Sequence, residues 1–512
     1  MHRRDVLKMT ATAIAGAASV LTLEGVSFAR ADGSARTAGE ETRHVTGRLP
    51  AGAPDFVHLP VEVPSGVREI AVSYTYDRPA VPSGTPGNAC DIGVFDERGT
   101  ELGGAGFRGW SGGARTEFAI SAERATPGYL PGPVRPGTWH IALGPYTVAP
   151  QGMAYDVTVT LRYGAPGLTP APVYPPRRAR GRGRAWYRGD NHLHSVHSDG
   201  LRTPAEIAAA ARAAGLDWIT TTEHNTTSSH AAWQGLWGDD LLILTGEEIT
   251  TRNGHVLALG TAPGTFLDWR YRARDHAFGR IARTVRRAGG LVVPAHPYGT
   301  CVGCNWKFGY EDADVVEVWN GLWTPDDEMA VATWDAMLAA PAREGGAWLP
   351  AMGNSDAHRE PQVVGLPQTV VLADDLSHDA LLAGLRAGRS WIAESSAVAL
   401  TFGATDGRGG HAGIGERLRV GPDAEVTVRL DVRGAPVTGC TVSFVTDQGV
   451  LLTTPVPADG RVEWHTTAAR SAYVRAEVRR PPAGGGGDGG GSGLPGAMVA
   501  LTNPVFLGRA VD

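Results

Sequence analysis

Residues 188–200 read RGDNHLHSVHSDG, and three histidines and two aspartates fall within positions 190–199 of this segment. His192 and His194 have the spacing His-x-His, and Asp199 follows five residues later. The segment is either a histidine-rich polar loop or the first part of a metal site. A metal site needs further ligands from distant parts of the chain, so the rest of the sequence decides between these interpretations.

Five later segments place His, Asp or Glu at or directly after short apolar runs. They are Glu223-His224-Asn225, Gly246-Glu247-Glu248 with His255 beyond it, Ala295-His296-Pro297, Glu317-Val318-Trp319-Asn320 and Asn354-Ser355-Asp356-Ala357-His358. Helical patterns alternate with these runs, which is typical of a parallel α/β barrel or sheet. Side chains that follow the carboxyl ends of such strands share one face. The sequence therefore predicts that all six segments converge.

Imidazoles and carboxylates crowded together without cations would be poorly solvated and repulsive, whereas divalent metals require neutral His and ionised carboxylate ligands. A nitrogen and oxygen set without thiolate suits Zn²⁺, Mn²⁺ or Fe²⁺. The candidates exceed what one tetrahedral ion can take, so two or three ions and a bridging carboxylate are expected. Asp190, Asn225 and Asn320 are expected to orient ligands or contact substrate. The metal-ligand candidates are His192, His194, Asp199, His224, Glu248, His255, His296, Asp356 and His358.

The sequence on both sides of this central region has β patterning. Residues 40–165 contain short β-type runs separated by Gly- and Pro-rich turns, which predicts an N-terminal β-sandwich. Residues 166–186 form a Pro- and Arg-rich linker, expected to be a solvated tether. Residues 187–395 are the metal-binding region, and residues 396–512 predict a C-terminal β-sandwich with a Gly-rich loop at 483–493.

The N-terminus has the layout of a twin-arginine signal peptide over residues 1–31. Arg3 and Arg4 precede an apolar run over 9–23, and Ala29-Arg30-Ala31 provides a cleavage site. An ordinary helix or a membrane anchor is the alternative, but the run is short for a bilayer. We expect export by the twin-arginine machinery to a secreted or extracytoplasmic location, without stable membrane insertion. The net charge of −6 argues against a nucleic-acid partner.

The chain has four cysteines: Cys90, Cys301, Cys304 and Cys440. An exported protein meets oxidising conditions, so disulfides are possible, and four cysteines allow three pairings. Cys301 and Cys304 form a Cys-x-x-Cys motif, which suits a loop disulfide, a redox pair or half of a zinc site. A second such motif is missing from the sequence, so the loop disulfide is favoured over structural zinc.

The ordered motifs HLHSVHSDG, TEHN, GEE followed by GH, AHP and SDAH resemble those of the PHP (polymerase and histidinol phosphatase) superfamily. The resemblance implies a distorted seven-stranded (β/α) barrel with a trinuclear metal site. The segments FRGWSGGARTEF (107–118), TPGYLPGPVRPGTWHIALGPY (126–146) and ALTNPVFL (500–507) are similar to the CehA/McbA, or carbaryl hydrolase-like, branch. A lysine-bridged amidohydrolase site is disfavoured, because Lys307 is the single lysine after residue 31 and lies in a loop beyond the His296 strand.

The resemblance also implies how the ligands divide among three ions. One ion takes His192, His194, Glu248 and Asp356. A second shares Glu248 and adds His255 and His296. The third takes Asp199, His224 and His358. The family pattern Gly-x-Glu selects Glu248 over its neighbour Glu247.

The predicted function is an exported multinuclear metal-dependent hydrolase that uses metal-bound hydroxide, with a phosphomonoester or phosphodiester favoured as substrate. His197 is the candidate proton donor, and Arg252, Arg359 and also Lys307 are candidates for holding the anion. The alternative is a carbamate or carboxylic ester hydrolase, which a cavity lined by Trp306, Trp319 and Trp323 would favour. The substrate in either case is a small-molecule or oligomeric ester. A non-catalytic cell-surface binding protein is the third hypothesis, and the complete ligand set argues against it.

Overall fold

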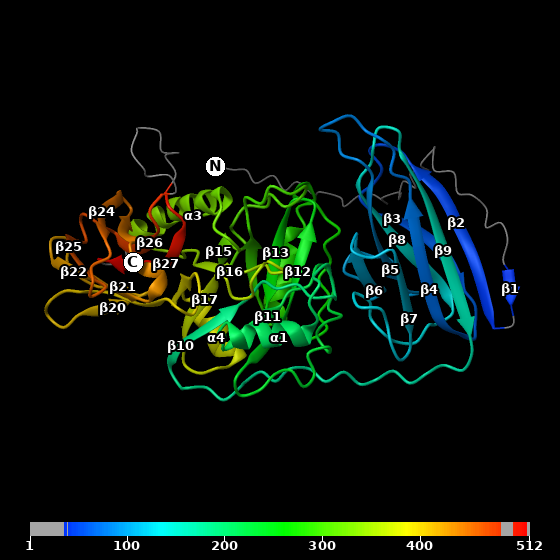
Figure 1. Ribbon diagram of the computed structural model, residues 1–512, viewed down its shortest axis with the longest axis horizontal. Helices are drawn as coiled ribbons and strands as arrows, with labels where there is room; N and C mark the ends of the chain where they lie inside the picture. The colour runs from blue at the N-terminus through cyan, green and yellow to red at the C-terminus, as the bar shows by residue number, and fades with distance from the viewer. Residues whose placement is uncertain (1–34, 38, 483–494, 509–512) are drawn as a thin grey trace, which may run out of the picture.

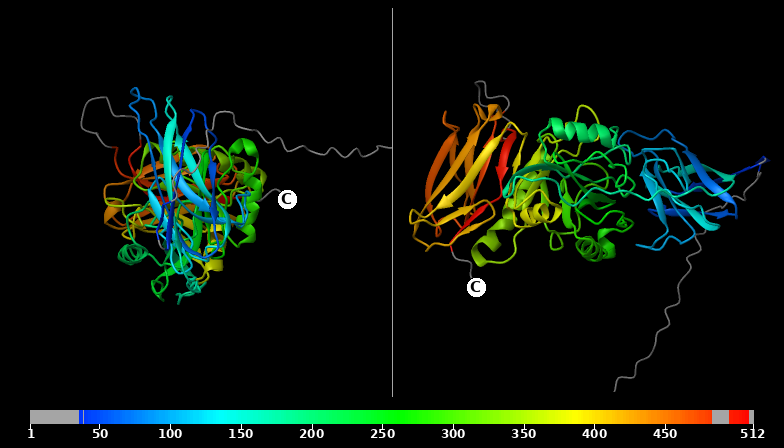
Figure 2. Two further views of the ribbon diagram at one scale, coloured as in Figure 1. Left: turned by 90° about the vertical axis from the view of Figure 1, so that its right-hand side faces the viewer. Right: turned by 90° about the horizontal axis from the view of Figure 1, so that it is seen from below.

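The computed structural model describes residues 35–37, 39–482 and 495–508. Three blocks of secondary structure follow one another in a row, with the N-terminal β-block at one end and the C-terminal strands at the other (Figures 1 and 2). The predicted signal peptide 1–31 and the Gly-rich loop 483–493 lie outside the described residues. None of the helices in the described part of the chain is long and apolar enough to cross a membrane.

The N-terminal β-block consists of two sheets that face each other. One has the order β1 (Ala35–Thr37), β2 (Glu40–Leu49), β9 (Met153–Tyr163), β4 (Val67–Tyr76) and β7 (Glu117–Ser121). The other has the order β3 (Val57–Val63), β8 (Gly137–Thr147), β5 (Ala89–Phe95) and β6 (Phe107–Gly112). Alternate residues of β9, such as Val157 and Val159, are buried between them against Trp139. This alternation is what a strand with one buried face requires.

The central region is a mixed α/β unit that holds all the predicted metal ligands. Its strands are β10 (Ala185–Asp190), β11 (Trp218–Thr221), β12 (Leu242–Thr251), β13 (Gly254–Leu259), β14 (Leu291–Ala295), β15 (Val316–Asn320), β16 (Ala351–Asn354), β17 (Gln368–Ala373) and β18 (Ser390–Ala393). Its helices are α1 (Pro204–Ala213), α2 (Phe278–Arg287), α3 (Pro325–Glu344) and α4 (His378–Arg386). The predicted capping box of Thr203 and Glu206 begins α1.

The strands of this unit are not all parallel, and their hydrogen-bonded sheets do not close into the expected seven-stranded barrel. β10, β11 and β12 are parallel, but β13 is antiparallel to β12 and to β14, and β17 is antiparallel to β10. β15 and β16 pair only with each other among the described strands. The reversal at β13 follows from the tight turn at Arg252-Asn253, which joins the paired residues Thr251 and Gly254, because a turn this short joins antiparallel strands. Asn-Gly between apolar runs was the sequence signal that the parallel prediction overlooked.

The C-terminal strands continue the central sheet. β18 pairs with β27 (Met498–Thr502), and the ladder extends through β26 (Tyr473–Arg479) and β23 (Thr441–Thr446) to β24 (Gly449–Pro455). A separate sheet contains β20 (His411–Gly413), β19 (Ala399–Thr405), β22 (Glu425–Arg433) and β25 (Arg461–Thr467). The short strands β21 (Arg417–Leu418) and β28 (Val505–Leu507) pair with each other. Backbone hydrogen bonding therefore crosses the predicted domain boundary at 395/396.

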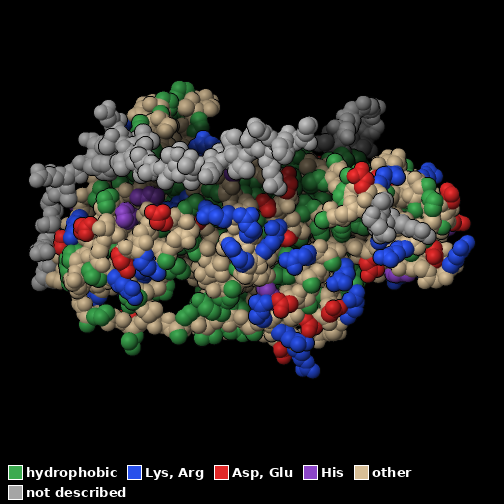
Figure 3. Space-filling model, turned by 180° about the vertical axis from the view of Figure 1, so that it is seen from behind, with side chains coloured by type: hydrophobic (Ala, Val, Ile, Leu, Met, Phe, Trp, Pro, Cys, Tyr) green, Lys and Arg blue, Asp and Glu red, His purple; other side chains and the backbone are tan. Residues whose placement is uncertain are grey.

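Four of the five arginines of the predicted linker are paired with acidic side chains of the central unit. Their ion pairs are Arg177–Asp379, Arg178–Asp375, Arg182–Asp217 and Arg184–Asp374, with N–O distances of 2.6 to 2.7 Å. Arginine and acidic side chains are interspersed over the middle of the molecule in the view of Figure 3. The basic run is therefore held along the central unit rather than free in solvent, although exposed pairs of this kind contribute little stability individually.

Candidate metal centre

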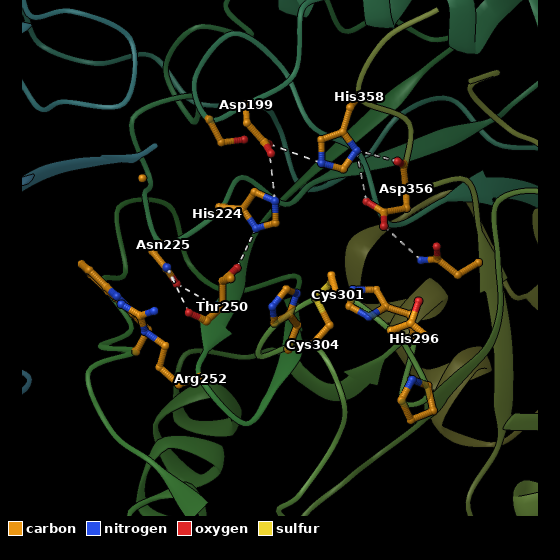
Figure 4. Close-up of a pocket in the computed structure, with 18 of the residues that line it drawn as sticks. Asp199, His224, Asn225, Thr250, Arg252, His296, Cys301, Cys304, Asp356 and His358 are labelled. Atoms are coloured by element: carbon orange, nitrogen blue, oxygen red, sulfur yellow. Dashed lines mark hydrogen bonds and ion pairs between the residues drawn. A yellow bond between two sulfur atoms is a disulfide. The ribbon is translucent and has the colours of Figure 1, made fainter. Parts of the chain in front are cut away.

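The nine predicted ligands meet in one place, from loops and strand ends of the central unit. His192 and His194 follow β10, His224 follows β11, His296 follows β14, and Asp356 and His358 follow β16. Glu248 lies on β12 and His255 on β13, the two strands of one hairpin. Asp199 lies in the turn after His194. Figure 4 shows Asp199, His224, His296, Asp356 and His358 around a shared space. The convergence predicted from the six segments is present in the structure.

Two imidazole nitrogens each lie close to the same two carboxylate oxygens. His192 Nε2 lies 3.3 Å from Glu248 Oε2 and 3.2 Å from Asp356 Oδ1. His194 Nε2 lies 3.3 and 3.1 Å from the same two oxygens. Metal–ligand bonds of about 2.0–2.1 Å in a tetrahedron place neighbouring ligand atoms about 3.3 Å apart. The spacing of these atoms therefore suits a divalent cation at their centre.

These four atoms are also buried without a hydrogen-bond partner in the described part of the chain. Buried polar groups are almost always satisfied, and each unsatisfied one costs about 1–3 kcal/mol. Four of them aimed at one point are best explained by a cation that they coordinate. The donor set and its burial therefore fit the metal predicted from the sequence.

Glu248 faces a second group of ligands with its other oxygen. Its Oε1 lies 2.9 Å from His255 Nδ1 and 3.3 Å from His296 Nε2. The two carboxylate oxygens thus point to different sets of imidazoles, which is the arrangement of a bridging ligand. Burial holds the pKa of His255 near 4, so that this ring is neutral as a metal ligand must be.

A third group lies at the outer side of the centre, around Asp199. Its Oδ1 is 3.4 Å from His224 Nε2 and 3.3 Å from His358 Nε2 (Figure 4). The His194 ring stacks against both the His224 ring and the His358 ring, with centroids 4.1 Å from each. His194 thus lies within reach of this group as well as the first one, whereas the resemblance assigns it to the first ion alone.

Electrostatic coupling within the cluster is strong in both directions. Burial would raise the pKa of Glu248, but the surrounding imidazoles outweigh it and hold the pKa well below the usual range. Burial would lower the pKa of His192, but the carboxylates, with Asp356 first, raise it well above its ordinary value. The close imidazoles and carboxylates thus favour protons or other positive charge between them. Divalent cations would displace these protons and supply that charge.

The neighbouring Glu247 points away from the cluster, as successive side chains of a strand do. Leu267 donates its backbone N–H to Glu247 Oε2 over 3.3 Å, and Oε1 has no partner among the described residues. Burial raises the pKa of Glu247 well above its usual value, so that this side chain is a neutral acid. The structure therefore places Glu248, and not Glu247, among the predicted ligands that converge.

A shell of hydrogen bonds orients the ligands. Thr250 Oγ1 lies 2.6 Å from His224 Nδ1, and Glu317 Oε1 lies 3.1 Å from His192 Nδ1. Of the residues predicted for this role, Asn320 donates to Asp356 Oδ2 over 3.3 Å, and Asp190 accepts from the backbone and side chain of Ser355. Thr250 and Glu317 had no predicted role, although Glu317 belongs to a strand-end motif.

Backbone strain is concentrated at this site. Among the described residues, four that are not glycine have a positive φ, and three of them are Asn225 (54°), His296 (27°) and Asp356 (48°). Left-handed conformations cost non-glycine residues about 1–3 kcal/mol and persist where the surroundings impose them. The concentration of strained residues here therefore supports the interpretation of this centre as a functional site.

A cavity of about 760 Å³ opens over the metal ligands. Of the predicted catalytic residues, Arg252 lines it: its guanidinium lies 3.9 Å from the Tyr146 ring centroid, and Nη2 is buried without a partner in the described chain. His197 and Arg359 are not in the lining. The His197 ring lies behind it, with Nδ1 2.9 Å from Ser228 Oγ, and Arg359 is exposed.

The aromatic side chains in the cavity are not the predicted ones. Trp306, Trp319 and Trp323 are missing from the lining, and Lys307 also lies outside it. Five other Phe, Tyr or Trp residues line the wall instead, three of them from the N-terminal β-block: Phe56, Trp110, Tyr146, Trp269 and Tyr298. Trp306, Trp319 and Trp323 pack in or against the hydrophobic cores instead. Most of the aromatic residues of the cavity wall come from the N-terminal β-block, which packs against the central unit.

The cysteine motif also borders this cavity. Cys301 and Cys304 form a disulfide with a Cα–Cα distance of 5.3 Å, which confirms the predicted loop disulfide. Cys90 and Cys440 are buried free thiols.

No family model and no curated protein match this sequence. Among solved structures, the chain is similar to a two-domain protein from Bacteroides vulgatus containing a predicted PHP-like metal-dependent phosphoesterase (16% identity, TM-score 0.34, 67% of this chain and 100% of that one). It is also similar to a candidate metal-dependent phosphoesterase from Bifidobacterium adolescentis (19%, TM-score 0.26, 41% and 96%). A third is an amidohydrolase from Chromobacterium violaceum (19%, TM-score 0.23, 35% and 89%). Scores this low do not establish a family for this chain.

Proposed function

We propose that this protein is a multinuclear metal-dependent hydrolase of the PHP type that cleaves phosphoesters. The observation that carries the proposal is a set of four buried ligand atoms without a hydrogen-bond partner among the described residues, in which each imidazole nitrogen lies 3.1–3.3 Å from both carboxylate oxygens, with Glu248 facing a second group of imidazoles. When bound, adjacent divalent ions lower the pKa of a coordinated water and neutralise charge on a phosphoryl group.

The chain's own residues prepare the cavity for an anionic substrate. Arg252 belongs to the cavity lining, its guanidinium stacks on the Tyr146 ring, and its Nη2 has no hydrogen-bond partner among the described residues. A guanidinium suits phosphate oxygens because its donors are rigid and permanently charged. Since phosphoryl transfer depends mainly on positioning and charge neutralisation, this arrangement favours a phosphoester.

Aryl carbamate or carboxylic ester hydrolysis is the second candidate. The observation that favours it is the aromatic part of the lining, in which the Trp110 and Trp269 ring centroids lie 4.8 Å apart. These rings would accept the aryl portion of either an aryl phosphate or an aryl carbamate. The aromatic wall therefore favours a substrate with an aryl leaving group, but it does not distinguish a phosphoester from a carbamate.

Three substrates measured side by side separate the candidates: p-nitrophenyl phosphate, bis-p-nitrophenyl phosphate and 1-naphthyl N-methylcarbamate. The protein is first stripped of metal and then supplied with Mn²⁺ or Zn²⁺. We expect turnover of at least one phosphate ester that depends on added metal. Metal-dependent turnover of the carbamate alone would replace the phosphoesterase proposal with the second candidate.

Adjacent glutamates supply a matched pair of variants. Glu248→Gln removes a ligand that faces two groups of imidazoles, so both metal content and turnover should be lost. Glu247→Gln replaces a buried neutral acid by a neutral amide of the same shape, so turnover should persist. If both variants lost metal and turnover equally, the substitutions would be acting by disturbing strand β12 and not by removing a metal ligand.

A further inference from the structure

Asp91 of β5 extends from the N-terminal β-block into the cavity over the metal ligands. Alternate residues of β5 lie on opposite faces of its sheet. Ile92 and Val94 are buried in the core of the β-block, whereas Phe95 packs in a second core shared with the central unit. Asp91 has the same parity as Phe95, so it faces the central unit where the cavity opens.

The β-block is held firmly in this position. Trp110 and Phe107 pack with Ile249 and Trp269 of the central unit in the shared core. Gly128 donates its backbone N–H to Ser228 Oγ over 3.0 Å. Asp91 is therefore a fixed part of the cavity wall.

The carboxyl group of Asp91 has no hydrogen bond or ion pair with any described residue, although the cavity contains other acids that do. Asp199 and Asp356 belong to the metal ligands. Glu317 accepts from His192, Asn320, Asn354 and the backbone of His296. Asp327 accepts from the backbone of Asn320 and from Thr324. Asp91 and Asp326 are thus the cavity carboxyls left free to meet a substrate.

The surroundings of Asp91 bring the pKa of its carboxyl closer to neutral pH, so that a fraction of the molecules carries the protonated form there. Burial raises the pKa of Asp91 to about 6, while the positive charges of Arg252 and His224 act in the opposite direction. Asp91 also interacts electrostatically with Tyr146 on β8 and with Cys90, its neighbour on β5. A proton donor works best when its pKa lies near the working pH.

We propose that Asp91 donates the proton to the leaving-group oxygen when a phosphoester is hydrolysed, which rests on the proposed function. In this step the bond between phosphorus and the ester oxygen breaks, and that oxygen takes the carboxyl proton of Asp91 to leave as a neutral alcohol. Water supplies the oxygen that phosphorus gains and releases its proton to solvent. The Asp91 carboxylate then regains a proton from solvent.

The test compares leaving groups, because a good leaving group departs without protonation. Asp91→Asn should lower kcat/KM for phenyl phosphate by about 100-fold or more. The loss should be much smaller for p-nitrophenyl phosphate, whose phenolate is stable. For phenyl phosphate the decline of kcat/KM above about pH 6 should also disappear in the variant. A loss that is equal for both substrates would overturn the proposal.

Two control variants locate the effect. Asp156→Asn removes an exposed carboxylate from β9 of the same block and should change neither substrate. Asp326→Asn removes the other free cavity carboxyl, and a leaving-group-dependent loss there instead of at Asp91 would overturn the proposal. Metal content by mass spectrometry should be unchanged in all three, since none of these residues is a proposed ligand.

Two measurements on the wild type do not depend on how any variant folds. Across substituted phenyl phosphates kcat/KM should depend weakly on the pKa of the leaving phenol, and a steep dependence would contradict proton donation. Carbodiimide labelling, which needs a protonated carboxyl, should modify Asp91 in the metal-free protein with a midpoint near pH 6. Failure of every phosphate ester to react would instead refute the proposed function itself.

Discussion

The Nδ1 atom of His192 lies 3.1 Å from Oε1 of Glu317, and both side chains are fully buried. The interaction fixes the ring so that Nε2 faces Glu248 and Asp356. Asn354 donates to the same carboxylate over 2.8 Å, and the backbone N–H of His296 donates to it over 2.9 Å. One carboxylate thus orients parts of the centre that come from three different strand ends.

Substitution of Glu317 should weaken metal binding without removing a ligand. Glu317→Gln places an amide where several donors converge, so we expect metal affinity to fall by about 10- to 100-fold. Competition with a chromogenic chelator measures the affinity. Glu344→Gln, at the exposed end of α3, is the control and should bind metal like the wild type. Unchanged affinity in Glu317→Gln would contradict an orienting role.

The group around Asp199 should lose its ion independently of the others. Asp199 lies next to His224 and His358, so Asp199→Asn should lower the metal content by one ion per chain. Native mass spectrometry measures the number of ions that remain. Loss of all metal would show instead that the three groups fill as one unit.

Metal removal should destabilise the folded protein. A ligand that binds only the native state stabilises it by about 2.7–4.1 kcal/mol at concentrations of 100–1,000 times its Kd. The Tm should therefore fall when a chelator is added and recover when metal is restored. The Tm of His194→Ala should respond much less to chelator. Equal responses of the two proteins would argue against this centre as the stabilising site.

Arg252 should affect substrate binding more than Arg359 does. An unpartnered donor that meets a charged oxygen contributes about 1.5–3 kcal/mol, so Arg252→Met should raise KM for a phosphate ester by about 10- to 150-fold. Arg359→Met is the matched comparison, because this arginine is exposed and outside the cavity lining. A larger effect at Arg359 would contradict the position that the structure gives to Arg252.

His230 should make the protein less stable in mild acid. Its Nε2–H donates to Gly246 O over 2.9 Å and its Nδ1 accepts from Gly264 N–H over 3.0 Å, which fixes the neutral ring. Burial lowers the pKa of His230 from 6.5 to about 4. Between these pH values the unfolded chain binds more protons, so the free energy of unfolding falls as the pH decreases from about 6.5 toward 4.

Denaturant unfolding at several pH values measures this contribution. His230→Leu should be less stable than the wild type at pH 7 but should lose less stability on acidification, by up to about 1.4 kcal/mol per pH unit. The other titrating groups are common to both proteins and cancel in the difference. Parallel pH dependences would show that His230 is not buried in its neutral form.

The candidate metal ligands could be predicted from the sequence because each one belongs to a local sequence pattern. An apolar run followed by His or a carboxylate defines a strand end, and strand ends of an α/β unit gather on one face. His192, His224, His296 and Asp356 could be collected in this way before their distances were known. The cysteine pair Cys301 and Cys304 was equally local, since its members are three residues apart.

Only the tertiary structure decided how these groups are shared and what surrounds them. The antiparallel hairpin that turns His255 toward Glu248, the sheets that stay open, and the position of His194 between two groups depend on pairings between distant segments. The docking of the N-terminal β-block likewise brings Asp91 and Trp110 to a centre more than 80 residues further along the chain. Such contacts depend on the packing of whole surfaces, and neither residue carries a local pattern that points to the metal centre.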